Sequence, residues 1–246
     1  MGDRENRRAP RTGARRVEVG GQELWLLAER AAWWPLESTL LVSDLHLGRP
    51  PTDDPYLTDP TIAAAADLSR LGELLDQLGA RRLWILGDLR HSSASGLGAA
   101  DEVLAVWLAA RGELEIHMVR GNQDEAAGDP SDAPGLHIHA PGRPEGPLTL
   151  HHYPPEPGDP GVSPAGWVAG HLHPAATFGG PRDAPRAPAF LVEGRGLVLP
   201  AFGSGTHAHP VRRRPDQHLF PIRNGIVERP IDLERHATSG RSNPGR

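Results

Sequence analysis

The sequence predicts an α/β protein in which two mixed β-sheets pack together with helices outside them. Two observations support this fold class. The first half of the chain alternates apolar strand-like runs with stretches of helical periodicity. After Asn122 the chain becomes rich in strands and in Pro/Gly-containing loops. A single doubly wound sheet would keep the alternation, so two packed sheets fit the change better.

The first half is predicted to hold four strands and two helices. Asp59 or Thr58 can cap the first helix, with Pro60 at an early helical position and Gly79 closing it. Its buried stripe has leucines at three- and four-residue steps, namely Leu68, Leu71, Leu75 and Leu78. The other elements are strands Gln22–Leu27, Thr39–Ser43, Leu83–Leu86 and Leu114–Val119 and a helix around Asp101–Arg111.

The second half is predicted to combine short strands with long irregular loops. Pro, Gly and Asp dominate Gly128–Pro147 and Pro154–Pro164, which are therefore expected to be loops. Loops of this length in a compact domain usually carry function or motion. The predicted strands are Leu148–His151, Trp167–Ala169, Phe190–Glu193, Gly196–Leu199, His218–Ile222 and Gly225–Pro230.

One domain is expected, over residues 17–235. Residues 1–16 are charged and residues 236–246 are rich in small polar residues, so both ends are predicted to be disordered tails. The chain has no cysteine, which excludes disulfides and thiolate metal sites. No apolar run approaches the roughly 20 residues that span a bilayer, and the N-terminus lacks the apolar core of a signal peptide. We therefore expect a soluble cytoplasmic protein without a membrane partner.

The charge pattern bears on nucleic-acid binding. The formal net charge of −5 argues against electrostatic binding of nucleic acid over the whole protein surface. Every basic residue is Arg, which fits the Ala-, Gly- and Pro-rich composition of a GC-rich genome. The arginines of residues 1–16 and Arg212–Arg214 are candidate DNA contacts, although such runs are more often solvated tails or loops.

Carboxylates follow two of the predicted strands of the first half. Asp44 and His46 alternate on an extended segment and so point to the same side, where they make a half-site for a divalent ion. The alternative is a capping Asp and a surface His. Asp88 follows the apolar run Leu83–Leu86, where a carboxylate is costly to desolvate unless it caps a helix or binds a cation. Two cations about 3.5–4 Å apart need a bridging carboxylate, and Asp88 is predicted in that role.

An amide and imidazoles follow the remaining strands. Asn122 offers a carbonyl oxygen to a metal and an amide donor to a phosphate, although a Gly-Asn turn commonly has no function. His151 and His152 end another strand, and only one can face the site; His152 is favoured and His151 is the alternative. His171 and His173, two residues apart, can each meet a different metal, since imidazole suits Mn, Fe and Zn.

Together these groups predict a two-metal site that cleaves phosphoesters. A protein has no structural need for carboxylate, carboxylate, amide and imidazole at five successive strand ends. The joint pattern therefore outweighs the structural alternative for each motif.

The chain resembles the calcineurin-like metallophosphoesterase superfamily over residues 20–230. The resemblance is carried by Ser43-Asp44-Leu45-His46, Gly87-Asp88, Gly121-Asn122-Gln123-Asp124, His151-His152 and Gly170-His171-Leu172-His173. More narrowly, the chain is similar to the ligase-associated DNA damage response endonuclease branch. That similarity is carried by residues 23–27, 41–48 and 170–174 and by Leu199-Pro200-Ala201-Phe202-Gly203.

The resemblance implies a four-layer α-β-β-α sandwich and two divalent metal ions, Mn²⁺ foremost, with Fe or Zn as alternatives. It also implies a ligand set for each ion. One ion would be held by Asp44, His46, Asp88 and His173, and the other by Asp88, Asn122, His152 and His171.

One position departs from the family pattern. The family has Gly-Asn-His-Asp where this chain has Gln123 before Asp124. The missing His is expected to protonate the leaving oxygen, with the following Asp orienting it. An amide cannot deliver a proton, so we expect slow turnover. His91 is a candidate substitute, and His207 and His209 are candidates to reach the substrate, although surface positions are the simpler expectation for all three.

The predicted function is a dinuclear-metal-dependent phosphodiesterase or endonuclease in DNA repair. Asp88, Asn122, Gln123 and Asp124 are its predicted catalytic residues. The expected partners are a phosphodiester substrate such as DNA and a DNA ligase or helicase. Two alternatives stay open: a small-molecule phosphomonoesterase or nucleotide hydrolase, and a weakly active metal-binding scaffold in a repair complex, the latter motivated by Gln123.

Overall fold

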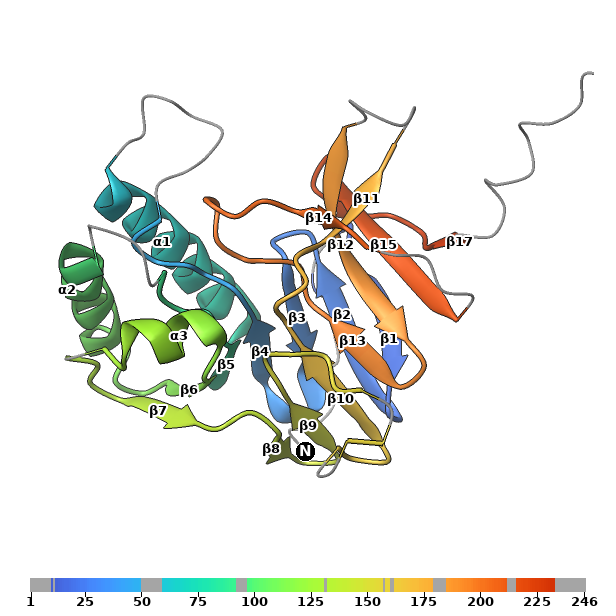
Figure 1. Ribbon diagram of the computed structural model, residues 1–246, viewed down its shortest axis with the longest axis horizontal. Coiled ribbons are helices and arrows are strands. Elements are labelled where there is room, and N and C mark those ends of the chain that lie inside the picture. Colours follow the sequence, from blue (N-terminus) through green and yellow to red (C-terminus); the bar gives the residue numbers. More distant parts are fainter. Residues whose placement is uncertain are drawn as a thin grey trace, which may run out of the picture.

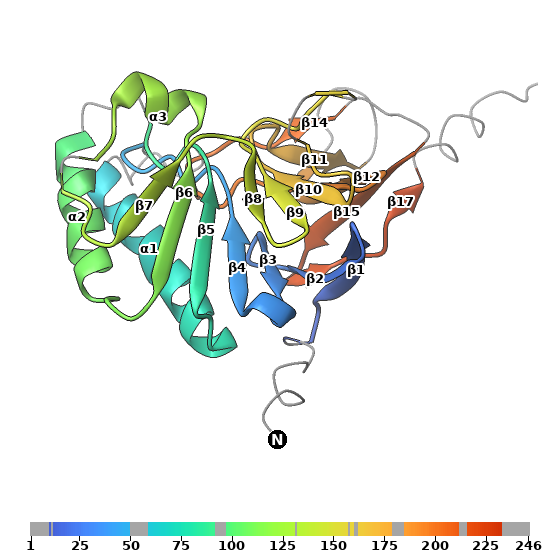
Figure 2. The ribbon, with the colours of Figure 1, turned by 90° about the horizontal axis from the view of Figure 1, so that it is seen from below.

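The structure, a computed structural model, describes residues 10, 12–49, 59–91, 97–130, 132–156, 158–159, 162–178, 185–211 and 216–232. Two mixed β-sheets pack together, and helices lie against the outer side of one of them (Figures 1 and 2). The predicted fold class, α/β with two mixed sheets and outer helices, is confirmed.

The first sheet has seven strands in chain order. Its first four strands pair antiparallel, and the pairs from the fourth to the seventh strand are parallel. The carboxyl ends of the parallel strands therefore meet at one edge of the sheet, where the site lies. The strands are β1 (Arg15–Val19), β2 (Gln22–Leu27), β3 (Ala31–Trp34), β4 (Thr39–Val42), β5 (Arg82–Leu86), β6 (Glu115–Val119) and β7 (Leu136–His139).

The second sheet has ten strands, and its central pairs β9–β10 and β10–β13 are parallel. Its main path runs through β14 (His209–Pro210), β11 (Pro174–Thr177), β12 (Arg186–Glu193), β13 (Gly196–Val198), β10 (Gly166–Ala169), β9 (Leu148–Leu150) and β8 (Arg143–Glu145). Strand β15 (Gln217–Arg223) pairs with β12 and with the short strands β16 (Ile226–Val227) and β17 (Ile231–Asp232).

Three α-helices and one 3-10 turn, η2 (Pro35–Glu37), complete the described part. They are α1 (Pro60–Leu78), α2 (Leu97–Ala109) and α3 (Asn122–Ala127). Helix α1 begins as predicted: the Asp59 side chain accepts a hydrogen bond from the Thr61 N–H at 2.9 Å, which caps the helix. Gly79 ends it in the left-handed conformation, with φ 60°.

Apolar side chains fill the space on both sides of the first sheet. Between helices and sheet lie residues such as Leu40, Leu71 and Leu104, and between the two sheets lie Trp34, Trp84 and Phe190. A smaller cluster around Leu191 covers the outer face of the second sheet. No helix of the described part lies on that face, so in these residues helices form only one outer layer of the four-layer arrangement (Figure 1).

Several predicted boundaries were wrong. Strands β7 and β8 lie inside 128–147, which was predicted to be loop, because pairing with β6 and β9 outweighs the turn-rich composition. Strand β1 begins at Arg15, inside the predicted tail, because it pairs with β2. Helix α2 starts before the predicted Asp101. The described part of 154–164 has no helix or strand.

Other sequence predictions lie outside the described residues. These are most of the tail 1–16, the tail 236–246 and Arg212–Arg214. Within the described residues, the structure has no helix that is both long and apolar enough to cross a membrane.

Candidate metal centre

The loops that follow β4 and β5 continue the pairing of the two strands. The Asp44 N–H donates to the Gly87 carbonyl at 3.0 Å, and the His46 N–H donates to the Asp88 carbonyl at 2.9 Å. These bonds fix the two loops side by side at the carboxyl edge of the first sheet. The side chains of Asp44, His46 and Asp88 are all buried there.

The backbone of the predicted ligands is unusual. Asp44, His46, Asp88, His171 and His173 all have positive φ, between 44° and 70°. This region is disfavoured for residues with a Cβ atom, and such strain concentrates at functional sites. The described part has eight non-glycine residues with positive φ, and five of them are the residues that the sequence predicts as metal ligands.

The predicted ligands form two groups that could each hold a metal ion. Asp44, His46 and His173 form the first group, and Asp88, His152 and His171 form the second. Within each group the ligand atoms lie within 4.8 Å of one another. The facing imidazole nitrogens are 3.4 Å apart in the first group (His46 Nε2 to His173 Nε2) and 3.2 Å apart in the second (His171 Nδ1 to His152 Nε2).

Asp88 lies between the two groups. Its Oδ2 is 3.7 Å from His46 Nε2, and its Oδ1 is 3.4 Å from His152 Nε2. One carboxylate oxygen thus faces each group, as a bridging ligand requires. The Asn122 Oδ1 is 3.1 Å from His152 Nε2, so the amide oxygen also faces the second group.

Hydrogen bonds to backbone carbonyls orient two of the imidazoles. His152 Nδ1 is 3.0 Å from the Leu86 carbonyl, and His173 Nδ1 is 3.2 Å from the His207 carbonyl. A ring that donates from Nδ1 presents the lone pair of Nε2 to a metal. Sequence reasoning missed both carbonyls, because a backbone acceptor can belong to any residue type.

The residues present fit a pair of divalent ions. Asp44 Oδ1 is buried beside His173 Nε2, at 3.3 Å, and has no hydrogen-bond partner, although buried polar atoms are normally satisfied. A Cβ on Gly170 would approach the Asp44 carboxylate to 2.7 Å, so the glycine permits the close approach. Oxygen and imidazole donors together suit Mn²⁺, Fe²⁺ and Zn²⁺.

Burial and neighbouring charges set the ionisation of the groups. Burial would raise the pKa of Asp44, but the neighbouring imidazoles, His173 foremost, hold it below its usual value. Burial lowers the pKa of His46 to about 3. Burial raises the pKa of Asp88 to about 6, against the opposing effect of His152. Asp44 and His46 are therefore in the forms that bind metals at neutral pH.

Comparison with known proteins identifies the family. A crystal structure of a Pseudomonas putida nuclease MPE superposes on the chain with a TM-score of 0.73 and 30% sequence identity, and the match covers 89% of this chain and 100% of that one. The chain belongs to the family of nuclease MPE. No protein-family model and no curated protein matches the sequence. Membership in the MPE family agrees with the predicted metallophosphoesterase-like fold, whereas the narrower branch stays a prediction.

In this member of the MPE family, the loop after β13 that contains Phe202 and Gly203 binds the segment of Ser43 and Asp44. The Phe202 N–H donates to the Ser43 carbonyl at 2.8 Å, and the Gly203 N–H donates to the Asp44 carbonyl at 3.1 Å. The buried Asp67 of α1 accepts from the Ser204 N–H at 2.8 Å and from its hydroxyl at 3.0 Å. No sequence pattern indicates that Asp67 supports the site.

Arg70, one turn after Asp67 on α1, fastens the same loop. It donates to the Phe202 carbonyl, and its guanidinium lies 3.8 Å from the centroid of the Phe202 ring. It also pairs with Asp67 at 3.1 Å. The loop is therefore held to helix α1 by the charged side chains of Asp67 and Arg70.

The structure separates the two candidate histidines after β9. His152 is fully buried within the second ligand group. His151 instead points away, and its Nε2 is 3.0 Å from the Thr149 hydroxyl. This is the arrangement expected for neighbouring residues of an extended chain.

The loop 121–124 orients Asp88 and begins helix α3. The Gln123 N–H donates to Asp88 Oδ1 at 2.9 Å, and the Gln123 side chain is half-buried. Asp124 accepts from the Gly121 N–H at 2.9 Å and from the Arg90 N–H at 3.1 Å. The backbone bonds of Asp124 show a capping residue that holds the loop in place.

Three further histidines lie near the ligands. The ring of His91 meets the ring of His46 edge-on, with centroids 5.5 Å apart. His209 stacks on His173, with centroids 5.9 Å apart, whereas His207 contributes its carbonyl as described. His209 is exposed on the short strand β14.

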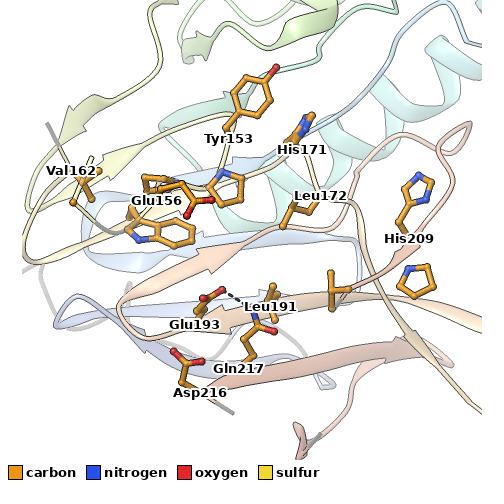
Figure 3. A pocket seen from close by; sticks show the side chains of 16 residues that line it. Tyr153, Glu156, Val162, His171, Leu172, Leu191, Glu193, His209, Asp216 and Gln217 are labelled. Carbon is orange, nitrogen blue, oxygen red and sulfur yellow. Dashed lines mark hydrogen bonds between the residues drawn. The ribbon is translucent and has the colours of Figure 1, made fainter. Parts of the chain in front are cut away.

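A cavity of about 730 Å³ adjoins the second ligand group (Figure 3). Tyr153 and His171 lie at one side, with their ring centroids 4.3 Å apart. Apolar and aromatic residues such as Trp167 and Leu191 form its walls, together with Glu156, Glu193 and Asp216. The Glu193 carboxylate accepts a hydrogen bond from Gln217 at 2.8 Å.

Proposed function

We propose that this protein is a metal-dependent nuclease that hydrolyses phosphodiester bonds in DNA, with Mn²⁺ as its activating ion. The observation that carries the proposal is the pair of ligand groups joined by Asp88. Similarity to a protein described as a nuclease supports it.

The ligand assignment follows the two groups. Asp44, His46 and His173 would hold one ion, His152, His171 and Asn122 the other, and Asp88 both. Ions bound there supply Lewis-acid activation of the phosphoryl group and of water. Because the side chain of Asn122 turns its amide oxygen toward the proposed ligands, its side-chain NH₂ group is left to donate to a phosphate oxygen.

Gln123 is expected to limit the rate. Its backbone orients Asp88, but its side-chain amide cannot protonate a leaving oxygen. Substrates with good leaving groups need little protonation and should be turned over best. This expectation separates a slow enzyme from an inactive scaffold.

The cavity beside His171 favours a substrate that continues beyond the phosphate. Aromatic and apolar walls suit a flat organic group, such as a nucleobase, better than a second phosphate, because three carboxylates also line the cavity. A diester carries a group on each side of the phosphate, and a monoester does not. The cavity therefore favours a substrate with an organic group on the phosphate, and similarity to a nuclease favours the diester.

A role in DNA repair rests on the family branch that the sequence resembles. We extend the proposal to a DNA ligase or helicase as the working partner. Affinity capture with the full chain and a purified ligase or helicase would test this part separately from the chemistry.

The test of the activity uses three substrates with Mn²⁺. We expect hydrolysis of bis-p-nitrophenyl phosphate and of DNA, little hydrolysis of p-nitrophenyl phosphate, and loss of all activity in Asp88→Asn. Asp76→Asn is the matched control, since this exposed aspartate near the end of α1 pairs with Arg111 at the opposite edge of the sheet from the proposed ligands. Full activity in Asp88→Asn would overturn the two-metal mechanism. Turnover of the monoester alone would indicate a phosphomonoesterase. No hydrolysis of any of the three substrates by protein with bound metal would indicate a scaffold.

A further inference from the structure

Three histidines form a cluster outside the metal centre, on strands β6 and β7. His117 of β6 lies opposite His137 of β7, and His139 follows two residues later on the same face of β7. His117 and His139 are half-buried, and His137 is exposed. The cluster lies beside Trp84, whose ring stacks on His117 with centroids 4.6 Å apart and an angle of 22°.

Two ring nitrogens of this histidine cluster face each other. His117 Nδ1 and His139 Nε2 are 3.1 Å apart. The facing imidazole nitrogens of the metal centre are separated by 3.2 Å and 3.4 Å. Two nitrogens bound to one tetrahedral zinc ion at 2.0–2.1 Å lie about 3.3–3.4 Å apart, so a small movement would bring this pair to ligand spacing.

The surroundings keep these imidazoles in the form that binds metals. Burial lowers the pKa of His117 to about 4, with further effects from His137 and His139. Burial and the charge of Arg143 lower the pKa of His139. Neutral imidazole has a lone pair to donate to a metal.

Nearby charges oppose a cation only weakly. Arg82 pairs with Glu115 at 2.7 Å and with Glu145 at 2.6 Å, which compensates its charge. Arg143 is the nearby cation that remains, and its side chain is exposed to water. Because solvent screens exposed charges, its repulsion of a bound ion is small.

We propose that this histidine cluster binds one Zn²⁺, Ni²⁺ or Cu²⁺ ion, independently of the two-metal centre. His117 Nδ1 and His139 Nε2 are the first two ligands, and His137 becomes the third when its exposed ring turns toward them. Nitrogen-only ligation favours these ions over Mn²⁺, which prefers oxygen. An ion bound there joins β6 to the edge strand β7.

The test measures metal content and affinity on the full chain, with Zn²⁺ as the probe. Metal-free protein is titrated by calorimetry, and the ions retained after dialysis are counted. We expect His139→Ala and His117→Ala each to retain one equivalent fewer than the wild type. His218→Ala, which removes an exposed histidine from β15 in the other sheet, should retain them all.

Two further measurements keep the test decisive. His139→Ala leaves the stack of Trp84 on His117 intact, and circular dichroism checks that it folds. In the wild type, Cu²⁺ should give an electron paramagnetic resonance signal with imidazole nitrogen couplings that His139→Ala loses. Equal metal content in the wild type and in a folded His139→Ala protein would overturn the proposal, as would a Cu²⁺ signal that this substitution leaves unchanged.

Discussion

The metal centre and the histidine cluster of β6 and β7 share a ligand spacing but differ in their backbones. Facing nitrogens lie 3.2–3.4 Å apart in the centre and 3.1 Å apart in the cluster. In the centre, five of the proposed ligands have positive φ on loops beyond the strands. In the cluster, all three residues belong to regular paired strands. Strained loops therefore set the geometry of the centre, whereas strand register and side-chain packing set that of the cluster.

The largest effect should separate the two regions by activity. Removing the buried imidazole in His152→Ala deletes a proposed ligand, and losing Lewis-acid stabilisation of several kcal/mol corresponds to roughly a 10³-fold fall in kcat/KM. His139→Ala should leave activity with saturating Mn²⁺ unchanged. Steady-state hydrolysis of bis-p-nitrophenyl phosphate measures both. Equal losses of kcat/KM in the two variants would contradict the expectation that the histidine cluster acts independently of the metal centre.

A second prediction concerns Gln123, which stands where the superfamily that the sequence resembles has His. Gln123→His places an imidazole beside Asp88 and should raise kcat by about 10²-fold for a poor leaving group, since a general acid contributes 10²–10⁴-fold. The gain should be much smaller with p-nitrophenolate. The ratio of the two gains is the measurement. No gain and no basal activity would instead favour a scaffold.

A third prediction tests support from helix α1. Asp67→Asn removes the charge that holds Ser204 and Arg70, and so loosens the loop on Asp44. Groups of this kind change metal affinity by about 10–100-fold, and we expect a rise of about tenfold in the Mn²⁺ concentration for half activity. Maximal activity at saturating Mn²⁺ should recover. Ser69→Ala, an exposed change on the same helix, is the control. An equal rise in the Mn²⁺ concentration for half activity in that variant would show that Asp67 does not support the site.

The smallest predicted effect is on stability without metal. The folded pKa of Asp88 is raised to about 6, above about 3.9 in an unfolded chain. The folded state therefore binds the extra proton between these values, and the free energy of unfolding falls as pH rises through this window. Asp88→Asn has no carboxylate to ionise, so its free energy of unfolding should not fall in this window. At pH 8 it should exceed that of the wild type by on the order of 1 kcal/mol, whereas at pH 4 it should not. Thermal unfolding in chelator measures the difference, and a less stable variant at pH 8 would contradict the prediction.

The sequence predicted the parts that depend on local chemistry. Asp59, Pro60 and Gly79 mark the ends of α1, and the apolar run around Leu41 marks a central strand. Because parallel strands end at a common edge, residues following β4, β5 and β6 could be expected to meet. These rules are local or depend on strand order alone.

The remaining features depend on contacts between distant segments. Strands β7 and β8 form because β6 and β9 offer pairing partners, although their own composition resembles a loop. The carbonyl of Leu86 orients His152 from 66 residues away, and Asp67 meets Ser204 across 137 residues. A backbone carbonyl or a helical aspartate has no sequence pattern that reveals such a role.

The proposed metal ligands come from both sheets of the molecule. Asp44 and Asp88 follow strands of the first sheet, whereas His152 and His171 follow strands of the second. Ions bound to them would cross-link two sheets that otherwise meet mainly through apolar side chains and the Arg82–Glu145 ion pair. Separating the sheets would then require release of the ions, so the free metal concentration sets how firmly the chain resists heat and proteases. The cell's supply of metal would thus govern the lifetime of the protein as well as its activity.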